Sequence, residues 1–266
     1  MIPPTFTQTP EESPLPSIEW PILLAGSGIA FLAGFVQGCT GFGMALIAAP
    51  ALLFLYPPTF VTPTVILLST INTAYVAFSA RRHIRARIVA PLALGAVFGI
   101  PMGIWALHHT NEVWLKIVLG AFVVTFALTL LSGWRKPIAR ALPAMVPVGM
   151  LSGFCGGSSS MGGPPVILFL ANQDTDRDVF RGNIVTYFLL INLYAIANFY
   201  FRGDISGDIV RQVAVFVPAV LMGSFTGVRT APHVPNELFK NIAMAAAAIM
   251  GTVLLLTNLY RLARGA

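Results

Sequence analysis

Two stretches of the chain combine glycine with hydroxyl side chains inside otherwise apolar surroundings. They are residues 38–43 (GCTGFG) and residues 153–165 (GFCGGSSSMGGPP). Glycine and proline interrupt a helix, and the first backbone N–H groups of the next helix are left without an intrahelical partner. Such N–H groups carry partial positive charge and bind oxyanions without a formal base. These stretches therefore predict reversible binding of an anion.

The residues expected to hold the anion lie in or beside these stretches, or are polar residues near apolar segments. They are Gln37, Gly38, Thr40, Gly41, Phe42, Gly43, Asn72, Ser158, Ser159, Ser160, Gly162, Gly163, Pro164, Arg181, Tyr187 and Asn192. Polar residues inside a membrane segment are candidates for function, and Tyr187 could stack on an aryl group. Interhelical hydrogen bonds explain Asn72 and Asn192 equally well, and GxxxG spacing also serves close helix packing. Arg181 either pairs with nearby acids or attracts the anion.

Catalysis is not indicated by the remaining reactive side chains. The four histidines lie at expected loops or helix ends, and none belongs to a metal-binding pattern. The serine run has no neighbouring base in an apolar segment that could activate it. We therefore expect no catalytic residue, metal or cofactor. A membrane-embedded enzyme and an ion channel are the alternatives to a transporter.

The driving force is also constrained by the charges. All ten carboxylates lie outside the apolar segments, so an intramembrane proton relay is not visible. The membrane potential alone favours anion export by about 2.3 kcal/mol per charge per 100 mV, which makes uncoupled export the simplest hypothesis. Coupling to Na⁺ or H⁺ stays open, as does a homodimer.

The composition indicates what must position these residues. The chain has 266 residues, of which 56% are hydrophobic and 10% are charged, and its mean hydropathy is +0.78. A soluble domain has about 25% charged residues, so lipid must cover most of the surface. The net charge of +6 does not indicate nucleic acid, because the basic residues flank apolar runs as topology determinants do. The sequence predicts an all-α, polytopic membrane protein.

Ten apolar segments are expected, in the order short, short, long, long, long, which occurs twice. They are residues 20–36, 43–56, 60–80, 88–107, 114–134, 142–155, 162–172, 184–201, 209–228 and 238–259. We expect a disordered tail (1–19), a first repeat (20–134), a cytoplasmic linker (135–141), a second repeat (142–260) and a short basic C-terminus (261–266).

Residue matches support a duplicated unit of four to five helical segments. Gly34, Gly38, Gly41 and Pro50 match residues 115 positions later, Asn72 and Arg82 match at 120, and Gly99 and Gly103 match at 124. Charge counting does not separate parallel from inverted repeats, and both place Arg81, Arg82, Arg85, Arg87 and the linker in the cytoplasm. Residues 20–56 as one helix would span about 55 Å, too long for a core of about 30 Å. A hairpin fits better and weakly favours inverted repeats.

The segment GFVQGCTGFGMALIAAPAL, with GGPPVILFL and VFRGN in the second half, resembles the TauE/SafE family of sulfite exporters and organosulfonate permeases. The resemblance covers residues 21–260. It implies a multi-pass transporter that moves sulfite or an organosulfonate across the bacterial inner membrane. It also places Gly38, Thr40, Gly41, Phe42 and Gly43 on the first family motif. Gly162, Gly163, Pro164 and Arg181 fall on the second.

Overall fold

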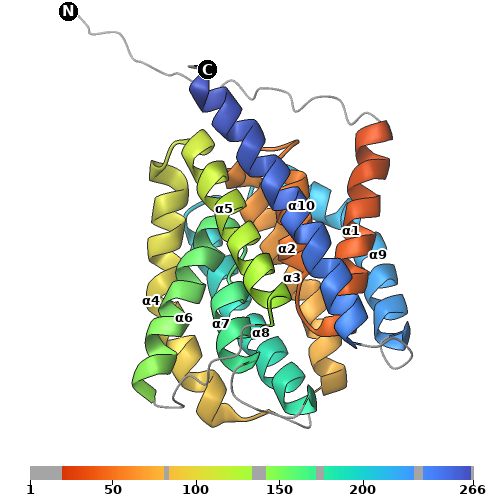
Figure 1. Cartoon of the computed structure of the whole chain (residues 1–266), viewed down its shortest axis with the longest axis vertical. Coiled ribbons are helices and arrows are strands. Elements are labelled where there is room, and N and C mark those ends of the chain that lie inside the picture. The colour runs from red at the N-terminus through yellow and green to blue at the C-terminus, as the bar shows by residue number, and fades with distance from the viewer. Residues whose placement is uncertain (1–19, 81–83, 134–141, 172–176, 231–235, 265–266) are drawn as a thin grey trace, which may run out of the picture.

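The computed structural model describes residues 20–80, 84–133, 142–171, 177–230 and 236–264, and this part of the chain is helical without strands. The helices are α1 (Trp20–Thr40), α2 (Met44–Leu52), α3 (Pro58–Ala80), α4 (Ala86–His109), α5 (Glu112–Leu131), α6 (Leu142–Ser159), α7 (Gly163–Ala171), α8 (Arg177–Phe201), α9 (Gly207–Thr230) and α10 (Asn236–Ala263). Figure 1 shows them as one bundle. The all-α prediction is confirmed. The expected tail and linker lie outside the described residues.

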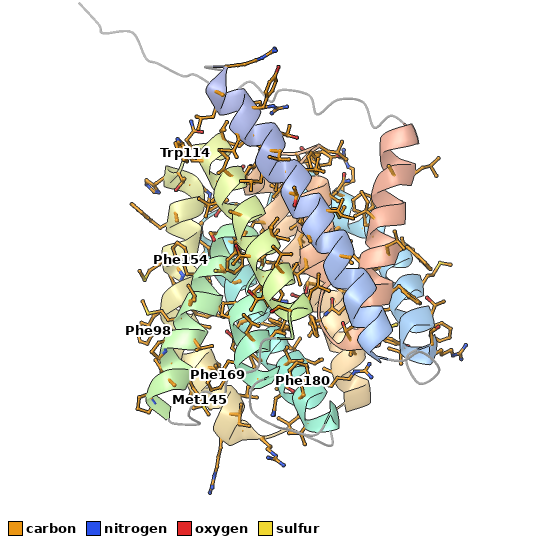
Figure 2. The ribbon with its side chains drawn as sticks, viewed as in Figure 1. Phe98, Trp114, Met145, Phe154, Phe169 and Phe180 are labelled. Carbon is orange, nitrogen blue, oxygen red and sulfur yellow. The ribbon has the colours of Figure 1, made fainter. Side chains whose placement is uncertain are left out.

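The outside of the bundle is apolar. Among the described residues, five helices are long and apolar enough to cross a membrane: α3, α4, α5, α8 and α9. Large side chains such as Phe98 and Trp114 are 60% and 52% exposed and point away from the bundle (Figure 2). An apolar surface that extends over several helices is unfavourable in water, whereas the hydrocarbon core of a bilayer covers it. The chain is a multi-pass membrane protein.

Both glycine-rich stretches interrupt the helices. α1 ends at Thr40 and α2 begins at Met44, with Gly41 and Gly43 between them at φ values of +84° and +102°. Glycine occupies this left-handed region without the steric penalty of a Cβ atom. In the second half, α6 ends at Ser159 and α7 begins at Gly163.

Glycine also allows two pairs of helices to approach closely. α4 packs most extensively on α6, and α1 on α9. A Cβ atom added to Gly99 of α4 would lie 2.0 Å from the carbonyl oxygen of Met150 on α6. One added to Gly223 of α9 would lie 2.1 Å from the carbonyl oxygen of Phe31 on α1. The backbones therefore touch directly, as in small-residue packing of membrane helices.

The two close pairs match residue by residue. Gly34 of α1 faces Val220 of α9, while Gly153 of α6 faces Ala96 of α4. The residue numbers of Gly34 on α1 and Gly153 on α6 differ by 119, and those of Ala96 on α4 and Val220 on α9 differ by 124. The contacts of Gly99 with Met150 and of Gly223 with Phe31 show the same two differences in residue number. The sequence match at 115 for α1 and α6 is therefore wrong by four residues.

The two breaks are related by the same difference in residue number. Gly41 and Ser160 differ by 119, and both have positive φ, +84° and +61°. The register could slip in the sequence because glycines recur every four residues in both helices, at Gly34 and Gly38 and at Gly149 and Gly153. A shift of four residues is about one helical turn, so it preserves the glycine-rich face.

The direction of the helices follows from their contacts. Successive residues along α1 contact successive residues along α9 in the same order, and the same holds for α4 and α6. The helices of each pair are therefore parallel. α4 and α8 are parallel too, because Arg85 N bonds to Asn183 Oδ1 at one end and His108 meets Asp204 at the other. The short turn after α8 reverses the chain into α9. Hence α1 and α6 run in opposite directions, as the inverted arrangement requires. The duplication itself stays a prediction.

Candidate functional site

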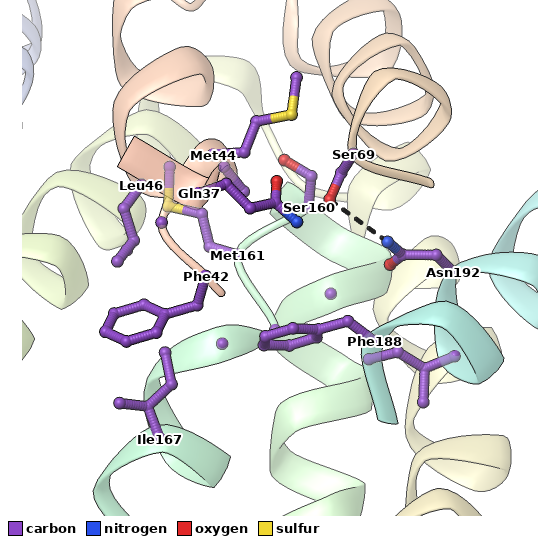
Figure 3. Close-up of a pocket in the computed structure, with 16 residues that line it drawn as sticks. Gln37, Phe42, Met44, Leu46, Ser69, Ser160, Met161, Ile167, Phe188 and Asn192 are labelled. Atoms are coloured by element: carbon purple, nitrogen blue, oxygen red, sulfur yellow. Dashed lines mark hydrogen bonds between the residues drawn. The ribbon is translucent and has the colours of Figure 1, made fainter. Parts of the chain in front are cut away.

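The two helix breaks meet at one cavity, here called the break cavity. It has a volume of about 40 Å³. Its walls come from α1, α2, α3, α6, α7, α8 and both breaks, and Figure 3 shows the side chains around it. The lining residues are Gln37, Phe42, Gly43, Met44, Ala45, Leu46, Ser69, Gly156, Ser160, Met161, Gly162, Gly163, Ile167, Phe188, Ile191 and Asn192.

The first turn of α2 borders the break cavity. Met44, Ala45 and Leu46 line the cavity and are the first three residues of the helix. Their N–H groups have no intrahelical acceptor, whereas Ile47 N already bonds to Gly43 O at 3.3 Å. The N-terminal end of a helix carries partial positive charge. This end of the cavity is therefore suited to an anion.

The start of α7 differs from the start of α2. Pro164 and Pro165 follow Gly163 and have no backbone N–H. Proline is favourable at the first positions of a helix because no intrahelical bond is lost there. The second break thus offers fewer amide donors than the first.

The hydroxyl groups of Thr40 and Ser159 hold the two breaks in the same way. Thr40 Oγ1 accepts a hydrogen bond from Phe42 N at 3.2 Å, and Ser159 Oγ accepts one from Met161 N at 3.3 Å. Each hydroxyl also donates to a carbonyl of its own helix, Val36 O for Thr40 and Cys155 O for Ser159. Both residues shape the turns and do not line the cavity.

Amide side chains connect the first break to α3. Gln37 Nε2 donates to Thr73 Oγ1 at 2.7 Å, and Asn72 Nδ2 donates to Gln37 Oε1 at 3.0 Å. All three residues are at most 2% exposed. Asn72 therefore orients Gln37 from behind, and only Gln37 reaches the cavity.

The second asparagine has a different place from the first. Asn192 Nδ2 donates to Ser69 Oγ at 3.4 Å, and both side chains line the cavity (Figure 3). This bond links α3 of the first half to α8 of the second. An anion could replace this long bond and accept from both groups.

Tyr187 and Ser152 fasten the second break from outside the cavity. Tyr187 Oη donates to Ser152 Oγ at 2.8 Å, and Ser152 Oγ donates to the Gly162 carbonyl. The tyrosine ring is fully buried, so it is not placed to stack on a ligand. Ser158 bonds to Phe154 O of its own helix at 2.9 Å.

Arg181 lies behind the first break. Its Nη2 donates to Gly38 O at 2.9 Å, and its Cγ would contact a Cβ added to Gly41. A cation at the C-terminal end of a helix opposes the partial negative charge there. Arg181 stabilises the end of α1 and does not line the cavity. Of the nearby acids, Asp174 and Asp176 lie outside the described residues.

The structure thus divides the predicted site residues into two groups. The cavity is lined by Gln37, Phe42, Gly43, Ser160, Gly162, Gly163 and Asn192. The supporting positions are Gly38, Thr40, Gly41, Asn72, Ser158, Ser159, Pro164, Arg181 and Tyr187. Sequence reasoning missed Ser69 and Phe188. Ser69 precedes Asn72 by three residues and Phe188 precedes Asn192 by four, so helical spacing from the two asparagines could have found them.

The arrangement offers binding groups but no catalytic set. Among the described residues, no three His, Cys, Asp or Glu side chains form a metal-binding group. Hydroxyl and amide groups lie around a small cavity between two helix breaks at matching places in the two halves. Broken helices paired in this way within a membrane bundle are typical of transporters.

Comparison with known proteins agrees with this class. Residues 27–254 match the family model "Sulfite exporter TauE/SafE", and the chain belongs to this family. It is a membrane transporter and not an enzyme. A "Probable sulfite/organosulfonate exporter TauE" from Cupriavidus necator is 24% identical over 247 residues, which cover 88% of this chain and 95% of the relative. No solved structure matches.

Proposed function

We propose that the protein carries a sulfur oxyanion across the membrane and binds it in the break cavity. The observation that carries this proposal is the meeting of both breaks at one cavity that the first turn of α2 enters. The oxyanion would accept hydrogen bonds from the N–H groups of Met44, Ala45 and Leu46. Asn192 and Ser69 would donate from the opposite wall. The names of the family and of its relative support a sulfur-containing substrate.

The size of the cavity favours a small anion such as sulfite. A single water needs about 10–15 Å³ of such volume, so 40 Å³ holds roughly three water-sized groups. An organosulfonate requires more room, which Phe42 and Phe188 would have to provide by moving. Both rings line the cavity and would then contact the organic part of the substrate.

The charge distribution supports a direction. Arg85 and Arg87 begin α4, and Arg181 and Arg229 lie at the same end of the bundle (Figure 1). Under the positive-inside rule this end faces the cytoplasm, and the start of α1 and the end of α10 lie at the other end of the bundle (Figure 1). In a bacterial inner membrane the inside-negative potential would then drive the anion outward.

Flux measurements test this function. Purified protein in proteoliposomes should carry sulfite at a rate that rises with the applied potential. Asn192→Leu removes a donor from the cavity and should lower the rate about tenfold. Asn258→Leu is the matched control, because Asn258 is a buried asparagine of α10 outside the cavity. It should leave the rate unchanged.

Two results would contradict the binding of a sulfur oxyanion in the break cavity, and a third would contradict uncoupled export. Wild-type protein that carries no sulfur oxyanion at any potential would refute the substrate class. Equal loss of flux in both asparagine variants would contradict binding of the anion in the break cavity. A strict requirement for Na⁺ or a proton gradient would refute uncoupled export but would not affect the assignment of the substrate class.

A further inference from the structure

A second and larger cavity lies between α4 and α8, and we call it the α4–α8 groove. Its volume is about 410 Å³, and it shares no lining residue with the break cavity. The lining residues are Pro101, Ile104, Tyr194, Ala197, Asn198, Phe201 and Arg202. From Tyr194 to Arg202 the groove follows α8 for about 12 Å.

The groove exists because the two helices cannot fill it. Pro101 has no N–H and its ring prevents regular hydrogen bonding in the middle of α4. Ala197 contributes only a methyl group on the facing side of α8. The groove also opens to the outside, since Phe201 is 86% exposed at its rim. The neighbouring exposed side chains of α4, Met102 and Trp105, are apolar, so lipid and not water is the solvent there.

Arg202 lies where the groove reaches the end of α8. Arg202 Nε lies 3.4 Å from Asp204 Oδ2, and His108 Nε2 lies 3.0 Å from Asp204 Oδ1. His108 Nδ1 is 2.9 Å from the carbonyl oxygen of Ile104. Both ring nitrogens of His108 therefore lie near oxygen atoms. The side chain of Arg202 is 45% exposed and approaches Asp204 through Nε, so its terminal guanidinium nitrogens can donate to a phosphate.

The other charged groups near this end pair with one another and not with Arg202. Glu112 and Lys116 of α5 pair with each other at 2.7 Å, and Asp208 and Arg211 of α9 lie 3.7 Å apart. His109 stacks on Trp105, with ring centroids 4.5 Å apart. Aromatic rings of this kind are common at the level of the lipid headgroups. The charged end of the groove thus lies at the membrane interface.

We propose that the α4–α8 groove binds an anionic phospholipid. The phosphate lies at Arg202, with Asn198 beside it, and an acyl chain follows the apolar wall formed by Ala197, Tyr194 and Pro101. A free anion would contact only the charged end of the groove, whereas a phospholipid would contact both the charged end and the apolar wall. Because Pro101 and Ile104 belong to the first half and Arg202 to the second, the bound lipid bridges the two halves. The proposal does not depend on the identity of the transported anion.

Thermal unfolding of the detergent-purified protein tests the site. Phosphatidylglycerol, phosphatidylcholine and inorganic phosphate are added separately to the full chain. We expect phosphatidylglycerol alone to raise the melting temperature. Arg202→Gln should weaken its binding about fivefold, and Ala197→Phe should weaken it by filling the groove. Arg211→Gln is the matched control, since Arg211 is an exposed arginine of α9 at the same end.

The two variants probe the headgroup and the chain separately, so a folding defect in one leaves the other informative. Equal stabilisation by phosphatidylcholine and phosphatidylglycerol would overturn the proposal, because the charge would then be irrelevant. A shift with inorganic phosphate that depends on Arg202 would overturn it in favour of a site for free anions. An unchanged phosphatidylglycerol response in both groove variants would also overturn it.

Discussion

Arg181 Nη2 donates a hydrogen bond to the carbonyl oxygen of Gly38, a residue 143 positions earlier in the chain, at 2.9 Å. Thr62 lies near the start of α3 as Arg181 lies near the start of α8, each being the fifth residue of its helix. Thr62 Oγ1 lies 3.5 Å from Ser158 O near the end of α6. A cation therefore holds the end of α1, whereas a neutral hydroxyl holds the end of α6.

Arg181→Gln should slow transport by about tenfold while the protein still inserts. The charged hydrogen bond to Gly38 is lost, and such bonds contribute about 1.5–3 kcal/mol. The turn of residues 41–43 would then hold the α2 donors less firmly. Flux in proteoliposomes is the measurement, and Arg87→Gln, an exposed arginine at the same end, is the control. A normal rate in the Arg181 variant would show that the end of α1 needs no cation.

Gly99→Ala and Gly223→Ala should destabilise the protein to a similar extent. The new Cβ atoms would lie 2.0 Å and 2.1 Å from carbonyl oxygens of α6 and α1, and overpacking costs about 1–3 kcal/mol. Gly28→Ala should be neutral or stabilising, because a Cβ there meets nothing within 4 Å. Melting temperatures in detergent compare the three. A strong loss in only one of the first two would show that the pairs α1/α9 and α4/α6 are not equivalent.

Phe188→Ala should change the size limit of the break cavity. Removing the ring enlarges the break cavity, so the rate of aryl sulfonate transport should rise relative to the rate of sulfite transport. Leu190→Ala, on the outer face of α8 and 48% exposed, should leave this ratio unchanged. Competition between the two anions in proteoliposomes measures the ratio. No change in the Phe188 variant would indicate that another residue limits the size.

Cysteine labelling should place the two ends of the bundle on opposite sides of the membrane. Cys39 and Cys155 are buried, so the native chain should react little with an impermeant thiol reagent. In intact cells, Arg261→Cys should be labelled and Arg87→Cys should be protected until the cells are opened. The reverse pattern would show that the arginine-rich end faces outward, and labelling of both would contradict the fold.

Much of the fold could be predicted, because apolar length and paired breaks are local properties of the chain. The start of α8 could not be found by this criterion. The helix begins at Arg177, seven residues before the expected segment, and its first turns contain charged residues that a hydropathy criterion rejects. α6 continues to Ser159 beyond the expected residue 155. Its serine hydroxyls bond to carbonyls one turn earlier and so remain compatible with helix.

The site was harder to predict than the fold. Composition located both breaks, but it could not distinguish a residue that lines the cavity from one that supports the turn. Thr40 and Ser160 both carry a hydroxyl group within two residues of a glycine, yet only Ser160 lines the cavity. His108 and Asp204 are 96 residues apart, and no local pattern connects them. Such pairs depend on the packing of the two halves.

The matched glycine contacts of α1 with α9 and of α4 with α6 have a consequence for the working cycle. Matching backbone contacts join α1 to α9 and α4 to α6, so we expect a rearrangement at one pair to be possible at the other as well. If the halves exchange shapes, the route to the bound anion closes on one face and opens on the opposite one, as alternating access requires. We expect the two end states to be close in energy, so that a modest electrical driving force can bias the cycle.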